Sequence, residues 1–262
     1  MRLPLINLVK SIAKQDVVPL YRQVAQHRKE DGSVCTEADL LTQASLSQAL
    51  INLKNCPVIG EEMNAQEQRR IWQNNHDYIW CIDPIDGTSN FANGIDYFAL
   101  SVALIHQGKP VLGVVHNPIT QETFSAEKGQ GSWFNEEKIV HQICHKNLHE
   151  AIASIDFKRL PPLLASRLSV NPPYASQRNF GACALEWCHV ALGRFDIYLH
   201  GGQKLWDYAA GALILEEAGG QFVTLEQDPF WHQSNPWKRS VIAAKNNQLF
   251  DQWLNWLTLN HK

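Results

Sequence analysis

The sequence predicts an α+β fold, in which a run of consecutive strands is combined with separate helices. Four short apolar stretches follow one another between residues 79 and 126, and a Gly-Lys-Pro turn joins the middle pair. Strands so close in sequence favour an antiparallel meander. Near the N-terminus, Leu5, Leu8, Val9 and Ile12 recur at helical spacing. A chain of 262 residues suits one domain, made of two closely packed halves of about 1–145 and 146–262.

The remaining elements follow from local signals. Pro19 should interrupt the first helix, and residues 27–33 form a charged loop. The second helix begins at Thr36 and carries Leu40, Ala44 and Leu50 on one face. Further strands are expected at 151–155, 195–199 and 240–244, and further helices at 182–192, 207–218 and 247–259. The proline-rich residues 160–174 are expected to form a hinge or a surface loop.

Composition argues against a nucleic-acid-binding, secreted, membrane-spanning or disulfide-rich protein. The net charge of −3 gives no reason to expect a nucleic-acid partner. The first nine residues lack the apolar core of a signal peptide, and no apolar run reaches membrane-spanning length. The six cysteines show no C-x-x-C spacing, so we expect reduced thiols in a cytoplasmic protein, not disulfides or zinc ligands.

The most informative segment runs from Trp80 to Thr88. Asp83 and Asp86 follow an apolar strand, so they should emerge together at a surface cleft. Pro84 stiffens the turn, Gly87 allows close approach of a ligand, and Thr88 can begin a helix. Hard oxygen ligands beside free backbone N–H groups suit a magnesium-bound phosphate. The alternative is an ordinary Asp-Pro turn with a helix cap.

Two other segments carry carboxylates in a similar setting. Gly60-Glu61-Glu62 follows a short apolar strand, and Trp206-Asp207 opens a long helix that stops at Gly219-Gly220. Taken singly, the first could be a solvated acidic turn, and Asp207 could be an acid favoured by the helix dipole.

The ordered set G-E-E, D-P-I-D-G-T and W-D-x-A-A-G resembles the inositol monophosphatase family of magnesium-dependent, lithium-sensitive phosphatases. The resemblance extends over nearly the whole chain, from Thr36-Glu37-Ala38-Asp39 to Glu217-Ala218-Gly219-Gly220. It implies a layered α-β-α-β-α sandwich of the inositol monophosphatase and sugar phosphatase type, with the site at the junction of the two halves. It also implies hydrolysis of a small phosphate monoester by a homodimer.

The resemblance further implies a ligand set for two or three Mg²⁺ ions. Glu61, Asp83 and the carbonyl of Ile85 would hold the first ion, and Asp83, Asp86 and Asp207 the second, with Glu61 touching a weaker third. Magnesium neutralises phosphate oxygens and lowers the pKa of a bound water.

The same resemblance gives Thr88 and Asp39 a catalytic role. Asp39 would bond Thr88, and Thr88 would orient the attacking water, while Glu61 completes the catalytic set. The backbone N–H groups of Gly87 and Thr88 would meet the phosphate, which also lies beside Asp86 and Asp207. A second helix N-terminus, following Gly181, should point at the same place. Structure alone offers another role for Asp39, because Thr36 and Asp39 form a capping box.

Two positions depart from the family pattern and bear on the substrate. Gly181-Ala182-Cys183 replaces glycine, Ser or Thr, and alanine, and Cys183 is either a substrate contact or a small buried residue. His200 stands where members acting on inositol phosphates often carry a glutamate, and it is either a substrate contact or a surface histidine.

These departures leave the substrate and the role open. An inositol monophosphate-like ester is the first expectation. Alternatives are 3'-phosphoadenosine 5'-phosphate or a sugar bisphosphate, and, in another class, a binding or regulatory protein with residual hydrolysis. The filled set of acidic positions argues against the last.

Overall fold

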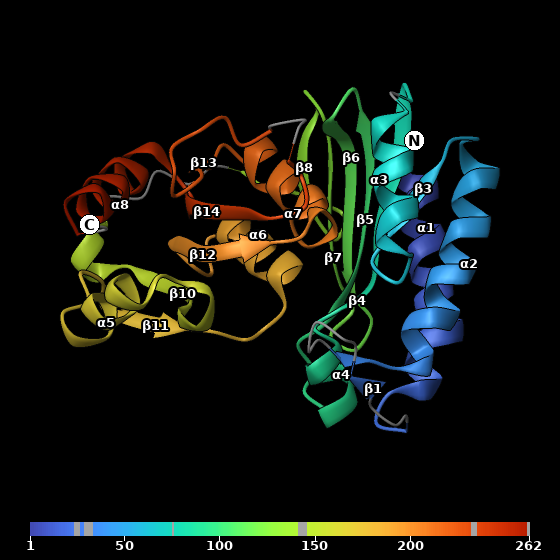
Figure 1. The fold of residues 1–262 in the computed structure, drawn as a ribbon, viewed down its shortest axis with the longest axis horizontal. Helices are drawn as coiled ribbons and strands as arrows, with labels where there is room; N and C mark the ends of the chain where they lie inside the picture. The colour runs from blue at the N-terminus through green and yellow to red at the C-terminus, as the bar shows by residue number, and fades with distance from the viewer. Residues whose placement is uncertain (24–26, 29–33, 75, 141–145, 232–234, 261–262) are drawn as a thin grey trace.

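Two β-sheets organise the chain, with helices between them and on both outer faces (Figure 1). The computed structural model describes residues 1–23, 27–28, 34–74, 76–140, 146–231 and 235–260. From one side of the molecule to the other, the layers run helix, sheet, helix, sheet, helix. This arrangement confirms the predicted α-β-α-β-α sandwich.

The larger sheet contains the predicted four-stranded meander, extended by one strand at one edge and by two strands at the other. Its strands lie in chain order, and all neighbours are antiparallel except the first pair. In that order they are β3 (Val58–Gly60), β4 (Tyr78–Asp86), β5 (Ala99–His106), β6 (Lys109–Asn117), β7 (Glu122–Glu127), β8 (Gly131–Phe134) and β9 (Glu137–Lys138).

The smaller sheet mixes parallel and antiparallel pairs, because helices connect several of its strands. Strand β10 is parallel to both of its neighbours, whereas β14 is antiparallel to both of its own. The spatial order is β11 (Ser176–Arg178), β10 (Ile152–Asp156), β12 (Ile197–Gln203), β14 (Arg239–Ala244) and β13 (Gln221–Val223). A separate two-stranded ribbon consists of β1 (His27–Arg28) and β2 (Val34–Cys35).

Helices form three of the five layers. The outer face of the larger sheet is covered by α1 (Arg2–Ile12) and α2 (Glu37–Leu53), and α6 (Cys183–Leu192) and α7 (Leu205–Glu217) lie between the sheets. The outer face of the smaller sheet carries α5 (Pro162–Val170) and α8 (Asn247–Asn260). The remaining helices are α3 (Ala65–Gln73), α4 (Thr88–Asn93), a π-helical turn (Ala13–Val17) and short 3₁₀ turns η2 (Val18–Leu20), η3 (Leu148–Glu150) and η4 (Phe157–Arg159).

Each interface between layers has its own hydrophobic core. Trp187 belongs to the core between the sheets, Trp80 to the core under α1 and α2, and Trp253 to the core under α5 and α8. Helix α7 is buried around nearly its whole circumference, as expected of a helix that packs against a sheet on each side. None of the described helices combines the length and apolar content needed to cross a bilayer.

Several predictions about individual elements were wrong. On α2, Leu50 is buried as predicted, but Leu40 is 56% exposed and Ala44 is exposed as well; the other buried positions are Ala38, Asp39, Thr42 and Leu46. Residues 162–170 form α5, because a proline is well placed in the first turn of a helix. His27 and Arg28 form a strand, while 29–33 lie outside the described residues. The boundary between two halves near residue 145 stays a prediction, because 141–145 also lie outside them.

Asp196 anchors the start of the smaller sheet. Its buried carboxylate accepts a bond from the N–H of Ile152 at 2.8 Å and from Nζ of Lys146 at 3.1 Å, and Lys245 pairs with it as well. Burial would raise the pKa of Asp196, but these bonds hold it below its ordinary value.

We expect Asp196→Asn to lower the free energy of unfolding by about 1–3 kcal/mol at pH 7, since bonds to a charged acceptor are lost. Because the folded pKa is lowered, this stabilisation is present above the unfolded pKa and is lost as the pH falls through the folded one. Denaturant titrations should therefore show a difference between wild type and variant that shrinks toward pH 3. A difference that stays constant would assign the effect to shape, not to charge.

Candidate metal centre and substrate site

An irregularity in β4 brings Asp83 and Asp86 to one face of the larger sheet. Asp83 is opposite Ser101 and Asp86 opposite Ala99, so β4 uses one more residue than β5 over this interval. In a regular strand, residues three apart point to opposite faces. The extra residue is a β-bulge, a place where proline is tolerated in a sheet, and Pro84 lies within it.

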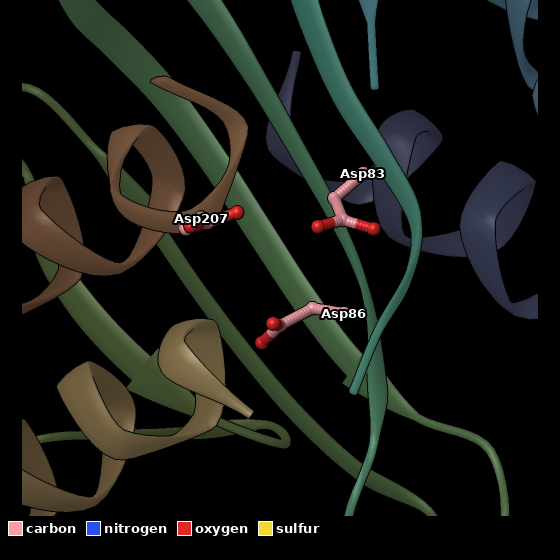
Figure 2. Close-up of side chains that lie close together, drawn as sticks. All are labelled: Asp83, Asp86 and Asp207. Carbon is pink, nitrogen blue, oxygen red and sulfur yellow. The ribbon is translucent and has the colours of Figure 1, made fainter. Parts of the chain in front are cut away.

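Asp207 approaches the same place from the first turn of α7. One carboxylate oxygen from each of Asp83, Asp86 and Asp207 lies within 4.8 Å of the other two. Figure 2 shows the three side chains pointing toward a shared space. The expected surface position of the first two is wrong, because Asp83 is 1% and Asp86 7% exposed. Two segments more than a hundred residues apart in sequence thus build one acidic centre.

The negative charges of this centre would be stabilised by a bound cation. Burial, then the neighbouring carboxylates, raise the pKa values of Asp83, Asp86 and Asp207 well above the ordinary range of an aspartate. Within the described chain, no lysine or arginine side chain forms an ion pair with any of the three. Oxygen donors at this spacing fit a hard divalent cation such as Mg²⁺. The chemistry of the donor set therefore fits the metal that the sequence predicted.

Glu61 borders the three-carboxylate centre. It directly follows β3, and its N–H donates to the carbonyl of Ile82 at 3.2 Å. Its negative charge contributes to the raised pKa values of Asp83, Asp86 and Asp207, although Glu61 is not one of the three residues whose oxygens lie within 4.8 Å of one another. The structure thus brings Glu61 to the edge of the centre.

Two glutamines that the sequence reasoning missed hold the backbone around Glu61. Oε1 of Gln43 accepts the N–H of Glu62 at 2.9 Å, and Nε2 of Gln68 donates to the carbonyl of Gly60 at 2.8 Å. The available signal was the spacing of Gln43 four residues after Asp39, which places both on one face of α2.

Thr88 and Asp39 form the pair that the resemblance implied. Oγ1 of Thr88 lies 3.1 Å from Oδ1 of Asp39 and 3.0 Å from the carbonyl of Ile85. Oδ2 of Asp39 accepts the N–H and the hydroxyl of Thr36, at 2.7 and 2.6 Å, so the capping box is present too. Burial raises the pKa of Asp39 to about 6, against the effect of these bonds. Both interpretations of Asp39 are compatible with the geometry.

The N-terminus of α6 points at the site, as predicted, but its donors are engaged by Asp86. The N–H of Cys183 donates to Oδ1 of Asp86 at 3.2 Å, and the N–H of Ala184 donates to Oδ2 at 2.7 Å. Gly181, with φ of +76°, makes the turn that starts this helix. At the start of α4, Gly87 has φ of +91°, and a Cβ there would lie 3.0 Å from that of Ala182. The two helix starts therefore lie against each other.

His200 is not the surface residue that the alternative interpretation described. Its side chain is 3% exposed, and Nε2 lies 3.2 Å from Oδ2 of Asp156 and 3.6 Å from Sγ of Cys183. Burial lowers the pKa of His200 despite the nearby Asp156, so the ring is neutral. Cys183 is partly exposed, and it links His200 to the acidic centre because its Sγ contacts His200 while its N–H bonds Asp86. Of the other cysteines in the described part of the chain, Cys35, Cys56, Cys81 and Cys188 are not in disulfides, and Cys144 lies outside the described residues.

Comparison with known proteins agrees with this geometry. Residues 5–258 match the sequence profile of the "Inositol monophosphatase family". An inositol-1-monophosphatase of Caulobacter vibrioides is 33% identical over 225 residues, which are 83% of this chain and 86% of the relative. A Nus factor SuhB of Pseudomonas aeruginosa is 31% identical over 233 residues, covering 83% of this chain and 84% of the relative.

Solved structures show the same architecture. The Thermotoga maritima IMPase superposes with a TM-score of 0.82 at 26% identity, over 98% of this chain and 96% of that one. The profile match spans nearly the whole chain and includes every acidic position described above. This chain belongs to the inositol monophosphatase family.

Proposed function

We propose that this protein is a magnesium-dependent phosphomonoesterase that hydrolyses a small ester resembling inositol monophosphate. The observation that carries the proposal is the convergence of Asp83, Asp86 and Asp207 on one buried space beside Thr88. Buried carboxylates that no described lysine or arginine side chain pairs with lower the stability of a fold, so this cluster serves no structural purpose on its own. Such a set is instead typical of a metal-dependent active site.

The carboxylates of Glu61, Asp83, Asp86 and Asp207, with the carbonyl of Ile85, would hold the magnesium ions. Bound magnesium would neutralise the phosphate oxygens and lower the pKa of the attacking water. Several bonds fix the ligands beforehand. The N–H of Ile85 bonds Asp83 at 3.0 Å, and the N–H of Lys204 bonds Asp207 at 2.8 Å.

Asp39 would polarise Thr88 during the reaction. If the Thr88 hydroxyl donates its hydrogen to Asp39, the lone pairs of Oγ1 are free to accept a hydrogen from the water that attacks the ester. This bond would orient the water without changing the charge of the site. The N–H groups of Gly87 and Thr88 would meet the phosphate at the start of α4.

Two alternatives remain from the sequence. A bisphosphate such as 3'-phosphoadenosine 5'-phosphate would need cationic groups near His200 and Cys183. Burial lowers the pKa of His200. However, Arg159 lies 4.0 Å from Asp156, the partner of His200, and Lys238 packs beside Gly202. A regulatory role is the second alternative, since one relative bears the name Nus factor SuhB. The absence of a nucleic-acid partner, a homodimeric state and a cytoplasmic location stay predictions.

Phosphate release by purified protein tests the proposal. We expect EDTA to abolish hydrolysis of myo-inositol 1-phosphate and magnesium to restore it, whereas calcium should support little turnover because it prefers longer bonds and looser geometry. The panel should include 3'-phosphoadenosine 5'-phosphate and fructose 1,6-bisphosphate. Hydrolysis that persists in EDTA would contradict the metal assignment, and no hydrolysis of any ester would favour the regulatory role.

A further inference from the structure

Asn90 joins three segments of the chain beside the acidic centre. It lies on α4, two residues after Thr88, and is partly buried. Its Nδ2 donates to the carbonyl of Tyr97 at 2.6 Å and to the carbonyl of Phe180 at 2.6 Å. Tyr97 leads into β5 of the larger sheet, whereas Phe180 precedes α6 between the sheets. One amide group therefore ties the start of α6 to α4, although the two positions are 90 residues apart in sequence.

Glu186 bonds the N–H groups of the same turn before α6. Its Oε1 accepts the N–H of Phe180 at 3.2 Å and the N–H of Gly181 at 3.4 Å. The side chain is 2% exposed and lies in the first turn of α6. Burial raises the pKa of Glu186 to about 7, although the two N–H groups act in the opposite direction. Because a single oxygen accepts both bonds, the neutral acid can accept them as the carboxylate does.

The Phe180–Gly181 turn depends on these bonds for its order. Phe180 is 41% exposed, and Gly181 is exposed with φ of +76°. A Cβ on Gly181 would lie 3.9 Å from Nδ2 of Asn90, so the asparagine lies directly beside the turn. An exposed turn has few buried apolar contacts to hold it. Asn90 and Glu186 instead bond one carbonyl and two N–H groups of its backbone.

The position of this turn bears on a proposed metal ligand. Helix α6 begins two residues after the turn. Its first two N–H groups, from Cys183 and Ala184, donate to Oδ1 and Oδ2 of Asp86 at 3.2 and 2.7 Å. Both oxygens of Asp86 are therefore oriented by the start of α6. Asp83 differs, because it accepts the N–H of Ile85 within its own bulge.

We propose that Asn90 and Glu186 are positioning residues that hold Asp86, through the start of α6, in the orientation that binds the second magnesium ion. This inference rests on the proposed magnesium-dependent function and concerns only the ion assigned to Asp86 and Asp207. The first ion is not assigned to Asp86, so its affinity should not depend on the turn.

Hydrogen exchange in the magnesium-free protein tests the positioning step. We expect Asn90→Ala to speed exchange of the Cys183 and Ala184 N–H groups about tenfold, because the bonds made by Nδ2 are lost. The N–H groups in the middle of β5 should exchange at the wild-type rate. Asn93→Ala is the matched control, since Asn93 lies on the same helix and its Nδ2 donates within it, to the carbonyl of Ser89 at 2.7 Å. Acceleration throughout the protein, or none at Cys183 and Ala184, would overturn the inference.

Calorimetric titration with magnesium tests the effect on the ion. Asn90→Ala should weaken binding of the second ion about tenfold, the lower end of the range for groups that support a metal ligand, and leave the first ion unchanged. Asp207→Asn alters a ligand of the second ion only. Adding Asn90→Ala to Asp207→Asn should therefore not weaken the remaining magnesium binding further. A further loss in that background would assign Asn90 a general structural role and overturn the inference.

Two neutral variants of Glu186 separate hydrogen bonding from charge. Glu186→Gln keeps an oxygen that can accept both N–H groups, so exchange at Cys183 and Ala184 should stay near the wild-type rate. Glu186→Leu has no acceptor, and it should speed this exchange and weaken binding of the second ion as Asn90→Ala does. Since both variants lack the charge, a difference between them reports the hydrogen bonds. Equal effects of the two variants would overturn the positioning role of Glu186.

The outcomes separate the inference from the function on which it rests. A wild type that binds magnesium and hydrolyses the ester, with an Asn90→Ala variant that binds magnesium equally well, would overturn the inference alone. A wild type that binds no magnesium would overturn the proposed function and the inference together.

Discussion

Asp83→Asn should lower kcat/KM at ordinary magnesium by at least about 100-fold. Groups that only support a metal ligand cost up to about that factor when removed, and Asp83 is proposed to contact two ions. The asparagine oxygen can still accept the N–H of Ile85, so the bulge should persist. The measurement is steady-state hydrolysis across a magnesium titration, with Asp251→Asn as the control.

The same substitution should stabilise the protein in EDTA. Without a cation, burial and the other carboxylates disfavour the ionised form of Asp83, and an asparagine removes that cost. Thermal unfolding should therefore show a higher Tm for the variant in EDTA, by about 2–4 °C for each kcal/mol gained. Magnesium should then raise the Tm of the wild type more than that of the variant. Full activity of the variant, or a lower Tm in EDTA, would count against a metal site at Asp83.

Thr88→Ala should lower kcat strongly while KM and magnesium affinity change little. This is the expected pattern when an interaction made only in the transition state is removed. Thr88→Ser is the matched control, because it keeps the hydroxyl and should be nearly silent. The structure does not support the predicted cap, because Gly87 is the N-cap of α4 and no described side chain caps it. If the Thr88 hydroxyl only holds the turn through Ile85 and Asp39, the alanine variant should lose roughly 1 kcal/mol of stability with a modest loss of activity.

Asp39→Asn should reproduce much of that loss. Both oxygens of Asp39 accept bonds, from Thr88 on one side and Thr36 on the other, and an amide offers only one acceptor. The double variant should cost far less than the product of the single effects. Rate losses that simply multiply would return Asp39 to the role of capping α2.

The sequence predicts the positions of the strands better than it predicts which side of a helix is buried. The strands around residues 99–117 are long apolar runs whose pattern has one explanation, a buried meander. On α2 the same reasoning failed, because Asp39 and Thr42 are buried and Leu40 is exposed. Asp39 can be buried because Thr36 and Thr88 satisfy its oxygens. The pattern of apolar residues along α2 cannot reveal Thr88, because this partner of Asp39 is 49 residues away in sequence.

The sequence likewise predicts the acidic residues of the site but not the contacts that surround them. Motifs in sequence order were enough to name the acidic residues that the structure brings together. The surroundings depend on contacts across elements that no local pattern records. His200 is buried because β10 places Asp156 beside it, and the backbone at Glu61 is fixed by Gln43 and Gln68 from two different helices.

The bulge in β4 determines whether Asp83 and Asp86, three residues apart, lie on the same face of the sheet. Asp86 is three residues after Asp83, but the bulge holds one extra residue, so the two are paired with β5 as if they were two residues apart. Straightening β4 without shortening it would turn one carboxylate through the sheet and away from Asp207, whereas deleting Pro84 or Ile85 would remove the surplus residue and leave an even spacing. Spacing and backbone irregularity must therefore change together. Two acids separated by two residues in a perfectly regular strand could never meet the same ion.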